Sequence, residues 1–255
     1  MGRVYALANQ KGGVGKTTTT VSLCAYLAQA GHKVLLVDTD PQANATSSLG
    51  IDKNALTNSV YEMLVGTQAA DSVVVISSQR GLDLIPSAPS LAGADIELIG
   101  LSGREVRLAQ ALMLLRSKYD YILIDTPPSL GLLTVNALVA SDGVIIPVQC
   151  EYLPLEGLAQ LLQTIEMVRT KLNPRLGIRG VLMTMFDPRT RIAREVVHDV
   201  RQQFPRITFK TIIPRSVRLS EAPSYGEPIG IYAPESSGAL AYNAFGKEFL
   251  DTEPK

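Results

Sequence analysis

The feature that most constrains this chain is the stretch LANQKGGVGKTTTT at residues 7–20. Its second half, Gly15-Lys16-Thr17, ends the phosphate-binding pattern G-x-x-x-x-G-K-[ST], in which a glycine-rich loop joins a strand to a helix. Such a loop points backbone N–H groups and the start of a helix at phosphate. Gln10 stands where the first glycine of the pattern belongs, and a second lysine, Lys11, follows it. The stretch therefore predicts a phosphate site and leaves Lys11 to be explained.

Apolar runs and helical patterns alternate along the rest of the chain. The expected strands are residues 4–8, 33–38, 82–86, 119–125, 143–148, 181–185 and 208–213. The expected helices are residues 17–30, 105–118, 155–172 and 192–204. Several strands are apolar throughout, as parallel strands covered on both faces are. The alternation predicts an α/β fold, a doubly wound and mostly parallel sheet flanked by helices. Because no linker or repeat interrupts it, we expect a single P-loop domain of residues 1–255.

The loop and the first turn of the following helix supply the phosphate ligands. We expect Lys16 to reach the β- and γ-phosphates, Thr17 to place its hydroxyl on Mg²⁺, and Thr18 to meet the α-phosphate. The expected nucleotide-binding residues of this segment are Lys11, Gly12, Gly13, Val14, Gly15, Lys16, Thr17 and Thr18.

Carboxylates follow two of the expected strands. YDYILIDTPPS ends an apolar strand with Asp125, the position of a Walker B aspartate, and VDTDPQAN supplies Asp38 and Asp40. Parallel strands end at the same edge of a sheet, which is where the phosphate loop also lies. A carboxylate after the second strand could orient the attacking water or hold the metal shell.

Composition excludes several classes of protein. Lys and Arg together number 24, as do Asp and Glu, so no global field attracts nucleic acid or membranes. Cys24 and Cys150 lie far apart, which excludes a disulfide scaffold and a cysteine-built zinc site and predicts two buried apolar side chains in a reducing cytoplasm. The N-terminus reads as a strand leading into the loop rather than a signal peptide, and no run approaches the roughly 20 apolar residues of a membrane span.

Five segments together resemble the ParA/Soj family of chromosome-partitioning ATPases, which carry a deviant Walker A loop. They are KGGVGKTT with Lys11, VDTDPQ, YILIDTPPSLG, PVQCEYLPLEGL and IPRSVRLSEAPSYGEPI, and they span nearly the whole chain. The resemblance implies ATP and Mg²⁺ as cofactors and an ATP-dependent homodimer, in which each Lys11 reaches the phosphates in its partner's site. A second cation there would stabilise transition-state charge as an arginine finger does.

The same resemblance assigns roles to individual residues. It makes Asp40 the residue that positions water, with Lys11 and Lys16 as the other catalytic residues. Asp125 would hold Mg²⁺ through water, beside the metal-site residues Thr17 and Asp40, and residues 126–131 would form a switch that senses the γ-phosphate. Pro214 and Arg215 would line the adenine, next to Ser216 where relatives often carry asparagine.

Positive charge is concentrated in one part of the chain. Residues 165–220 contain twelve Lys or Arg and four Asp or Glu, although the whole chain is neutral. Within them, Arg189, Arg191 and Arg194 stand at the start of an expected helix, and Arg218 follows the last strand. An ordinary solvated helix face would also explain these arginines. No aromatic residue interleaves with them, so we expect sequence-independent contact with DNA phosphates rather than base stacking.

The resemblance adds that the nucleotide-bound dimer binds double-stranded DNA without sequence specificity and that a ParB/Spo0J-like protein stimulates hydrolysis. It places the protein in the cytoplasm, associated with the nucleoid.

Other functions remain open. A MinD-like membrane-surface ATPase would need a basic amphipathic C-terminal helix, whereas the tail KEFLDTEPK is acidic, so we expect no membrane binding. A metabolic or electron-transfer relative is a further possibility, although an iron–sulfur protein would need a cluster-binding cysteine pair. The same ATPase could also position a cargo other than a chromosome or plasmid.

Overall fold

A computed structural model describes residues 1–151 and 154–253, with the backbone alone at residues 95 and 154–156. All of its strands belong to one sheet. They are β1 (Arg3–Leu7), β2 (Val34–Asp38), β3 (Val75–Ile76), β4 (Leu82–Ile85), β5 (Tyr121–Asp125), β6 (Gly143–Gln149), β7 (Gly177–Phe186) and β8 (Thr208–Pro214). Their order in the sheet is β3-β4-β2-β5-β1-β6-β7-β8.

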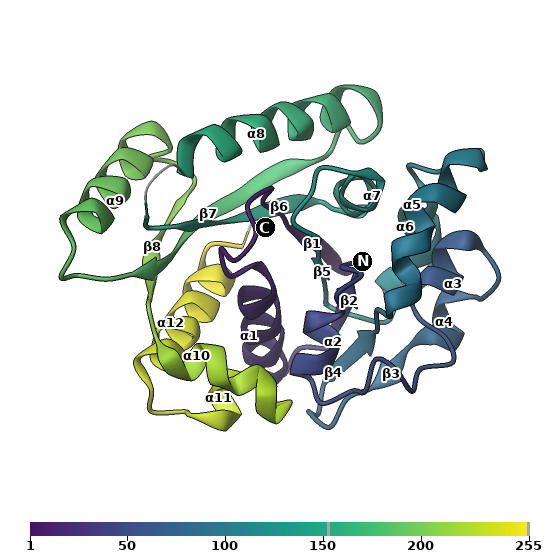
Figure 1. Cartoon of the computed structure of the whole chain (residues 1–255), viewed down its shortest axis with the longest axis horizontal. Coiled ribbons are helices and arrows are strands. Elements are labelled where there is room, and N and C mark those ends of the chain that lie inside the picture. Colours follow the sequence, from purple (N-terminus) through teal and green to yellow (C-terminus); the bar gives the residue numbers. More distant parts are fainter. Residues whose placement is uncertain (152–153, 254–255) are drawn as a thin grey trace.

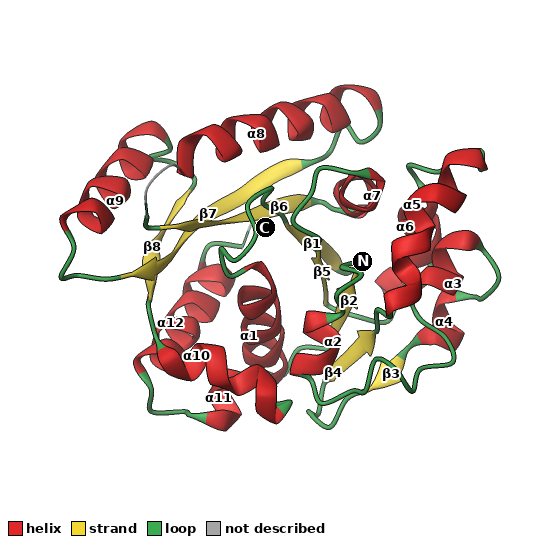
Figure 2. Cartoon of the chain, viewed as in Figure 1, coloured by secondary structure: helices red, strands yellow, loops and turns green. Residues whose placement is uncertain are grey.

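The sheet is parallel except at one edge, where the two-residue strand β3 pairs antiparallel with β4. Strand β1 lies between β5 and β6, so the loop that leaves it emerges near the centre of the sheet (Figure 2). The register aligns Leu7 with Asp125 and Asp38 with Asp125. The phosphate loop and the two expected carboxylate segments therefore start side by side, and the predicted doubly wound, mostly parallel sheet is confirmed.

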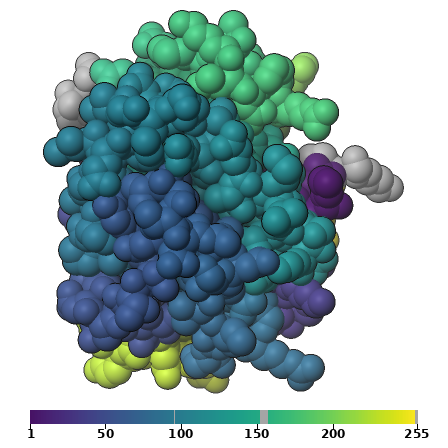
Figure 3. Space-filling view, turned by 90° about the vertical axis from the view of Figure 1, so that its right-hand side faces the viewer, coloured from purple at the N-terminus to yellow at the C-terminus, as the bar shows by residue number. Residues whose placement is uncertain are grey.

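Helices cover both faces of the sheet. They are α1 (Lys16–Gln29), α2 (Asn44–Ser48), α3 (Val60–Val65), α4 (Ala70–Val73), α5 (Ala94–Glu97), α6 (Arg107–Leu112), α7 (Leu132–Ala140), α8 (Pro154–Lys171), α9 (Arg191–Gln203), α10 (Val217–Glu221), α11 (Ile229–Tyr232) and α12 (Ser237–Asp251). Figure 1 shows α7, α8 and α9 on one side of the sheet and α1 and α12 on the other. Figure 3 shows the β3 edge, where segments α3 to α6 form the surface in blue and teal.

Alternate residues of each strand enter different cores, because successive side chains point to opposite faces. Val4 and Ala6 of β1 join the core under α7 and α8, whereas Tyr5 and Leu7 join the core under α1 and α12. Burial on both faces explains why these strands read as continuous apolar runs.

The structure differs from the sequence-based expectation in several elements. The helix expected at 105–118 is shorter, because α6 is followed by a separate 3₁₀ turn at Leu115–Ser117. Helix α7 went unpredicted because its sequence, LLTVNALVA, is apolar on nearly every side and has no amphipathic period. Helix α12 and strand β3 were also unpredicted. Residues 152–153 of the segment PVQCEYLPLEGL and residues 254–255 of the acidic tail lie outside the described residues. Among the described helices, none is long and apolar enough to cross a membrane.

Candidate nucleotide site and arginine surface

The loop between β1 and α1 has the backbone of a phosphate cradle. Gly13 and Gly15 have positive φ values of 73° and 87°, which side chains other than glycine rarely adopt. Helix α1 begins at Lys16, so its first N–H groups face the same side as the loop. The Thr184 hydroxyl at the end of β7 donates a 2.8 Å hydrogen bond to the Val14 carbonyl and fixes the loop from outside.

A hollow of about 350 Å³ lies over this loop and brings together most of the predicted phosphate-site residues. It is lined by Gly12, Gly13, Gly15, Lys16, Thr17, Thr18, Asp40, Gln42, Asn44, Pro128 and Met185. Pro128 comes from the predicted switch at 126–131, in which the Thr126 hydroxyl donates to the Leu7 carbonyl at 2.8 Å. The predicted switch is thus anchored to the strand that carries the phosphate loop.

The two lysines of the loop occupy different environments. Lys16 is only 6% exposed, and its Nζ donates a 3.3 Å hydrogen bond to the Lys11 carbonyl. Burial lowers the pKa of Lys16, while the carboxylates of Asp125 and Asp40 act in the opposite direction. The Lys11 side chain is exposed and does not line the hollow over the phosphate loop of its own chain.

Asp125 lies beneath the loop and is fully buried. Its two carboxylate oxygens accept hydrogen bonds from Thr17 at 2.7 Å and from Thr20 at 3.0 Å. Burial, reinforced by the nearby charge of Asp38, raises the pKa of Asp125 to about 8. Asp38 is also buried, but it accepts hydrogen bonds from Thr46 and from the Asp40 backbone and does not line the hollow. Burial raises its pKa to about 6.

These oxygens fit a magnesium ion. Thr17, Asp40 and Asp125 offer hydroxyl and carboxylate ligands, which Mg²⁺ prefers. Lys16 is the one cation near the buried carboxylates of Asp40 and Asp125 among the described residues that line the hollow. Among the described residues, no group of three His, Cys, Asp or Glu side chains could hold a metal alone. Mg²⁺ characteristically binds through one or two protein ligands, water and substrate phosphates, so this donor set suits it.

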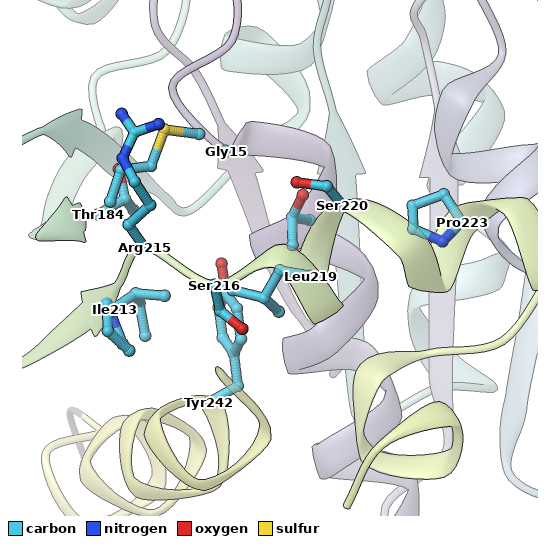
Figure 4. A pocket seen from close by; sticks show the side chains of 12 residues that line it. Gly15, Thr184, Ile213, Arg215, Ser216, Leu219, Ser220, Pro223 and Tyr242 are labelled. Atoms are coloured by element: carbon cyan, nitrogen blue, oxygen red, sulfur yellow. The ribbon is translucent and has the colours of Figure 1, made fainter. Parts of the chain in front are cut away.

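A second hollow, of about 190 Å³, continues from Gly15 and Thr18 toward helix α12 (Figure 4). Pro214 and Arg215, predicted to line the adenine, both line it, as does Ser216. Its full lining is Gly15, Thr18, Thr184, Met185, Ile213, Pro214, Arg215, Ser216, Leu219, Ser220, Pro223 and Tyr242. The mostly apolar wall suits a flat heterocycle next to the phosphates.

Several residues of the site escaped the sequence analysis. Thr20 could have been recognised, because it lies three residues after Thr17 on the same helix face and binds the same carboxylate. Tyr242 could not, since its hydroxyl reaches Thr19 at 2.9 Å across 223 positions. Thr39 donates its hydroxyl to the Asp125 carbonyl at 2.6 Å, a contact created only by the pairing of β2 with β5.

The predicted arginines gather at the same end of the sheet. Arg189 follows β7 and Arg218 follows β8, and these strands pair at Phe186 and Pro214. Arg189, Arg191 and Arg218 form ion pairs with Asp187, Glu195 and Glu221 respectively. Arg194 is exposed on α9.

Arginines that follow β7 and β8 both lower the pKa of Asp187. The hydrogen bonds and charge of Arg189, with the charge of Arg215, lower the pKa of Asp187 to about 2. Beside Arg218, the Tyr232 hydroxyl donates a hydrogen bond to Glu221, and the Tyr232 ring stacks on Tyr225. The chain fold brings together residues that the sequence separates.

The strand–loop–helix cradle, the buried lysine and the Thr17–Asp125 pair define a P-loop nucleotide-binding protein. Residues 2–178 match the family described as AAA domain. The sporulation initiation inhibitor protein Soj of Bacillus subtilis (strain 168) is 54% identical over 248 residues, which cover 97% of this chain and 98% of Soj. The chromosome partitioning protein ParA of Myxococcus xanthus (strain DK1622) is 50% identical over 250 residues, which cover 98% of this chain and 88% of that ParA.

Among solved structures, the cobyrinic acid a,c-diamide synthase from Mycobacterium smegmatis with bound ATP analog and magnesium is similar, with a TM-score of 0.87 and 41% identity. The match covers 98% of this chain and 95% of that one. The chain belongs to the ParA/Soj family of partitioning proteins, as its motifs predict.

Proposed function

We propose that this protein is an ATP-dependent switch for DNA segregation. ATP and Mg²⁺ bind over the phosphate loop, two copies close into a sandwich dimer, and the dimer binds double-stranded DNA without sequence specificity. Slow hydrolysis of ATP to ADP and phosphate, stimulated by a ParB/Spo0J-like protein, releases the DNA. The protein then acts in the cytoplasm, on the nucleoid.

The two lysines divide the work between protomers in this proposal. Lys16 binds the phosphates of its own site, and the exposed Lys11 binds those of the partner's site. Asp40, which lines the phosphate hollow, orients the attacking water. Bound Mg²⁺ would neutralise charge on the phosphate oxygens, with Thr17, Asp40 and Asp125 as the residues around it.

The observation that carries the link between nucleotide and DNA is the position of helix α10. Leu219 and Ser220 of α10 line the second hollow, next to the phosphate loop (Figure 4). Ser216, just before the helix begins, lines the same hollow. Arg218, from the same helix, has a side chain that is 59% exposed and does not line the hollow. One short helix therefore joins the nucleotide site to the arginine surface, formed by Arg189, Arg191, Arg194 and Arg218.

The arginine surface of one protomer is small, and three of its four side chains already pair with carboxylates. A dimer presents two such surfaces to one duplex, and linked weak sites bind far more tightly than either alone. Phosphate contacts of this kind weaken steeply with salt. Dimerisation thus gives ATP control over DNA binding.

The test is DNA binding by the whole chain with ADP, with ATP and with a non-hydrolysable analogue, each with Mg²⁺ and at two salt concentrations. We expect retention of any DNA sequence with the analogue, little with ADP, and loss at the higher salt. Equal binding in all nucleotide states would contradict the switch.

The similar M. smegmatis structure is that of a cobyrinic acid a,c-diamide synthase, so a metabolic role is the second candidate. It predicts ATP turnover that depends on a small-molecule acid and is indifferent to DNA and to a ParB-like protein. A MinD-like role predicts ATP-dependent binding to anionic vesicles. A switch that positions a cargo other than DNA would still bind DNA in a nucleotide-dependent way. It would differ only in the partner protein that links it to the cargo.

A further inference from the structure

Asp40 stands on a loop whose conformation is not favourable by itself. The loop joins β2 to α2 and contains Ala43 at φ 53°, in the left-handed region that non-glycine residues rarely adopt. Such a conformation costs on the order of 1 kcal/mol or more and persists only where surrounding contacts hold it. Something in the structure must therefore fix the backbone on which Asp40 is mounted.

Three buried polar side chains surround that backbone. Asp38 accepts a 3.1 Å hydrogen bond from the Asp40 N–H, and its other oxygen accepts from the Thr46 N–H and hydroxyl, both at 2.8 Å. Ser87 donates its hydroxyl to the Asp40 carbonyl at 2.7 Å. Its own N–H donates to the Thr46 hydroxyl oxygen at 2.9 Å. Asp38, Thr46 and Ser87 are each fully buried.

These contacts close around Asp40 from two strands. Asp38 ends β2, and Ser87 follows the neighbouring strand β4, which pairs with β2 in parallel register. Asp38 binds the N–H of Asp40, and Ser87 binds the Asp40 carbonyl. The peptide units on both sides of the Asp40 Cα are therefore fixed. The Asp40 carboxylate itself accepts a 2.9 Å hydrogen bond from the Gln42 N–H. Asp40 lines the phosphate hollow, whereas Asp38, Thr46 and Ser87 do not.

We propose that Asp38, Thr46 and Ser87 are positioning residues for hydrolysis, which set Asp40 against the attacking water without touching nucleotide. The inference rests on the proposed ATPase function and deepens it. A displacement of about 1 Å at a group that orients a reactant costs on the order of 100-fold in rate. Nucleotide binding depends on the phosphate loop and the second hollow, so it does not share this sensitivity.

The experiment compares Ser87→Ala and Thr46→Val with the wild-type chain for Mg²⁺-dependent ATP turnover and for affinity toward a fluorescent ATP analogue. We expect turnover to fall about tenfold for Ser87→Ala and more for Thr46→Val, with affinity unchanged within about twofold. Thr46→Ser retains the hydroxyl and should restore most of the turnover. Ser141→Ala is the matched control, because Ser141 is also buried and donates to a carbonyl, that of Ala137, outside the loop that carries Asp40.

A second measurement separates positioning from general destabilisation. Amide hydrogens of residues 39–47 should exchange faster in Ser87→Ala, while those of β1 and β5 keep their protection. In an Asp40→Ala background the Ser87 substitution should not slow the residual single-turnover hydrolysis any further, because residues that act as a unit are not additive.

Each part fails in its own way. The positioning role is overturned if Ser87→Ala and Thr46→Val keep wild-type turnover. It is also overturned if turnover falls in parallel with nucleotide affinity and falls in Ser141→Ala as well. A wild-type chain that does not hydrolyse ATP, with or without DNA, overturns the proposed function and this inference with it.

Discussion

The Thr17 hydroxyl donates a 2.7 Å hydrogen bond to the buried carboxylate of Asp125. This contact joins the first turn of α1 to the end of β5 directly beneath the phosphate loop. Asp125 is fully buried, and its raised pKa means that it holds a proton until about pH 8 in the folded chain. An unfolded aspartate releases that proton near pH 4.

The sign of the resulting pH dependence follows from proton counting. Between about pH 4 and pH 8 the folded state binds a proton at Asp125 that the unfolded state has released, so stability falls as pH rises. Without nucleotide and with EDTA, the melting temperature of the wild-type chain should therefore fall relative to Asp125→Asn between pH 5 and pH 8.5. Thermal melts of both proteins across this range measure it. A constant difference between the two would show that Asp125 is already ionised at pH 5.

Lys11→Ala should separate nucleotide binding from dimerisation. The Lys11 side chain is exposed and outside its own hollow, so its loss should change ATP affinity by no more than about threefold. The ATP-dependent dimer should disappear, because the partner's phosphates lose a cation. Light scattering after size exclusion gives the mass, and Lys16→Ala is the comparison that should lose nucleotide altogether. A Lys11→Ala dimer in ATP would refute the exchange of lysines between protomers.

Asp40→Ala should bind ATP and then fail to hydrolyse it. The residue lines the phosphate hollow, but the phosphate loop and the second hollow remain complete without it. The variant should accumulate as a DNA-bound dimer with ATP itself, as the wild-type chain does with a non-hydrolysable analogue. Gel shifts and phosphate release measure the two effects. Phosphate release at the wild-type rate would remove Asp40 from its proposed role.

The cysteines should be inert in the folded protein. Both are buried, as expected from the sequence, and burial raises the pKa of the Cys150 thiol to about 12. Because the thiolate is the reactive form, neither should react with a disulfide reagent at pH 8 until denaturant is added. Rapid labelling of one thiol in the native state would show that its core opens locally.

Local motifs predicted much of the site, whereas contacts between distant segments could not be predicted. The glycines, Lys16 and Thr17 form one continuous loop, so a spacing pattern is sufficient to find them. Asp38 and Asp40 look alike in VDTDPQ, yet only Asp40 lines the hollow. Asp38 instead accepts hydrogen bonds from Thr46. Ser87, which the pairing of β2 with β4 brings close, donates to the Thr46 hydroxyl and to the Asp40 carbonyl.

The fold shows the same division. Strands buried on both faces were found from their apolar runs, but α7 was missed because it is apolar too and lacks a period. The pairs Arg191–Glu195 and Arg218–Glu221 follow helical spacing, whereas Arg189–Asp187 depends on the turn after β7. The local charge balance located the basic segment, and the structure shows that three of the four residues of the arginine surface already pair with carboxylates.

Replacing Arg189 and Arg218 by glutamate should abolish DNA retention without affecting the ATP-dependent dimer. Each reversal removes one phosphate contact and adds repulsion, and a dimer carries every change twice. Arg169→Glu is the matched control, because Arg169 is exposed on α8 and pairs with Glu166 three residues away, as Arg218 pairs with Glu221. That control should bind DNA like the wild-type chain.

Removing the carboxylates should have the opposite effect. Asp187→Asn and Glu221→Gln release Arg189 and Arg218 from their ion pairs and take negative charge off the surface. Exposed pairs of this kind are weak, so their loss should leave the fold intact. The gain in net positive charge should tighten DNA binding by roughly tenfold. Fluorescence anisotropy with a labelled duplex, titrated at several salt concentrations, measures both affinity and salt slope. If affinity is unchanged in both the glutamate and the amide variants, the arginine surface is an ordinary solvated face and DNA binds elsewhere.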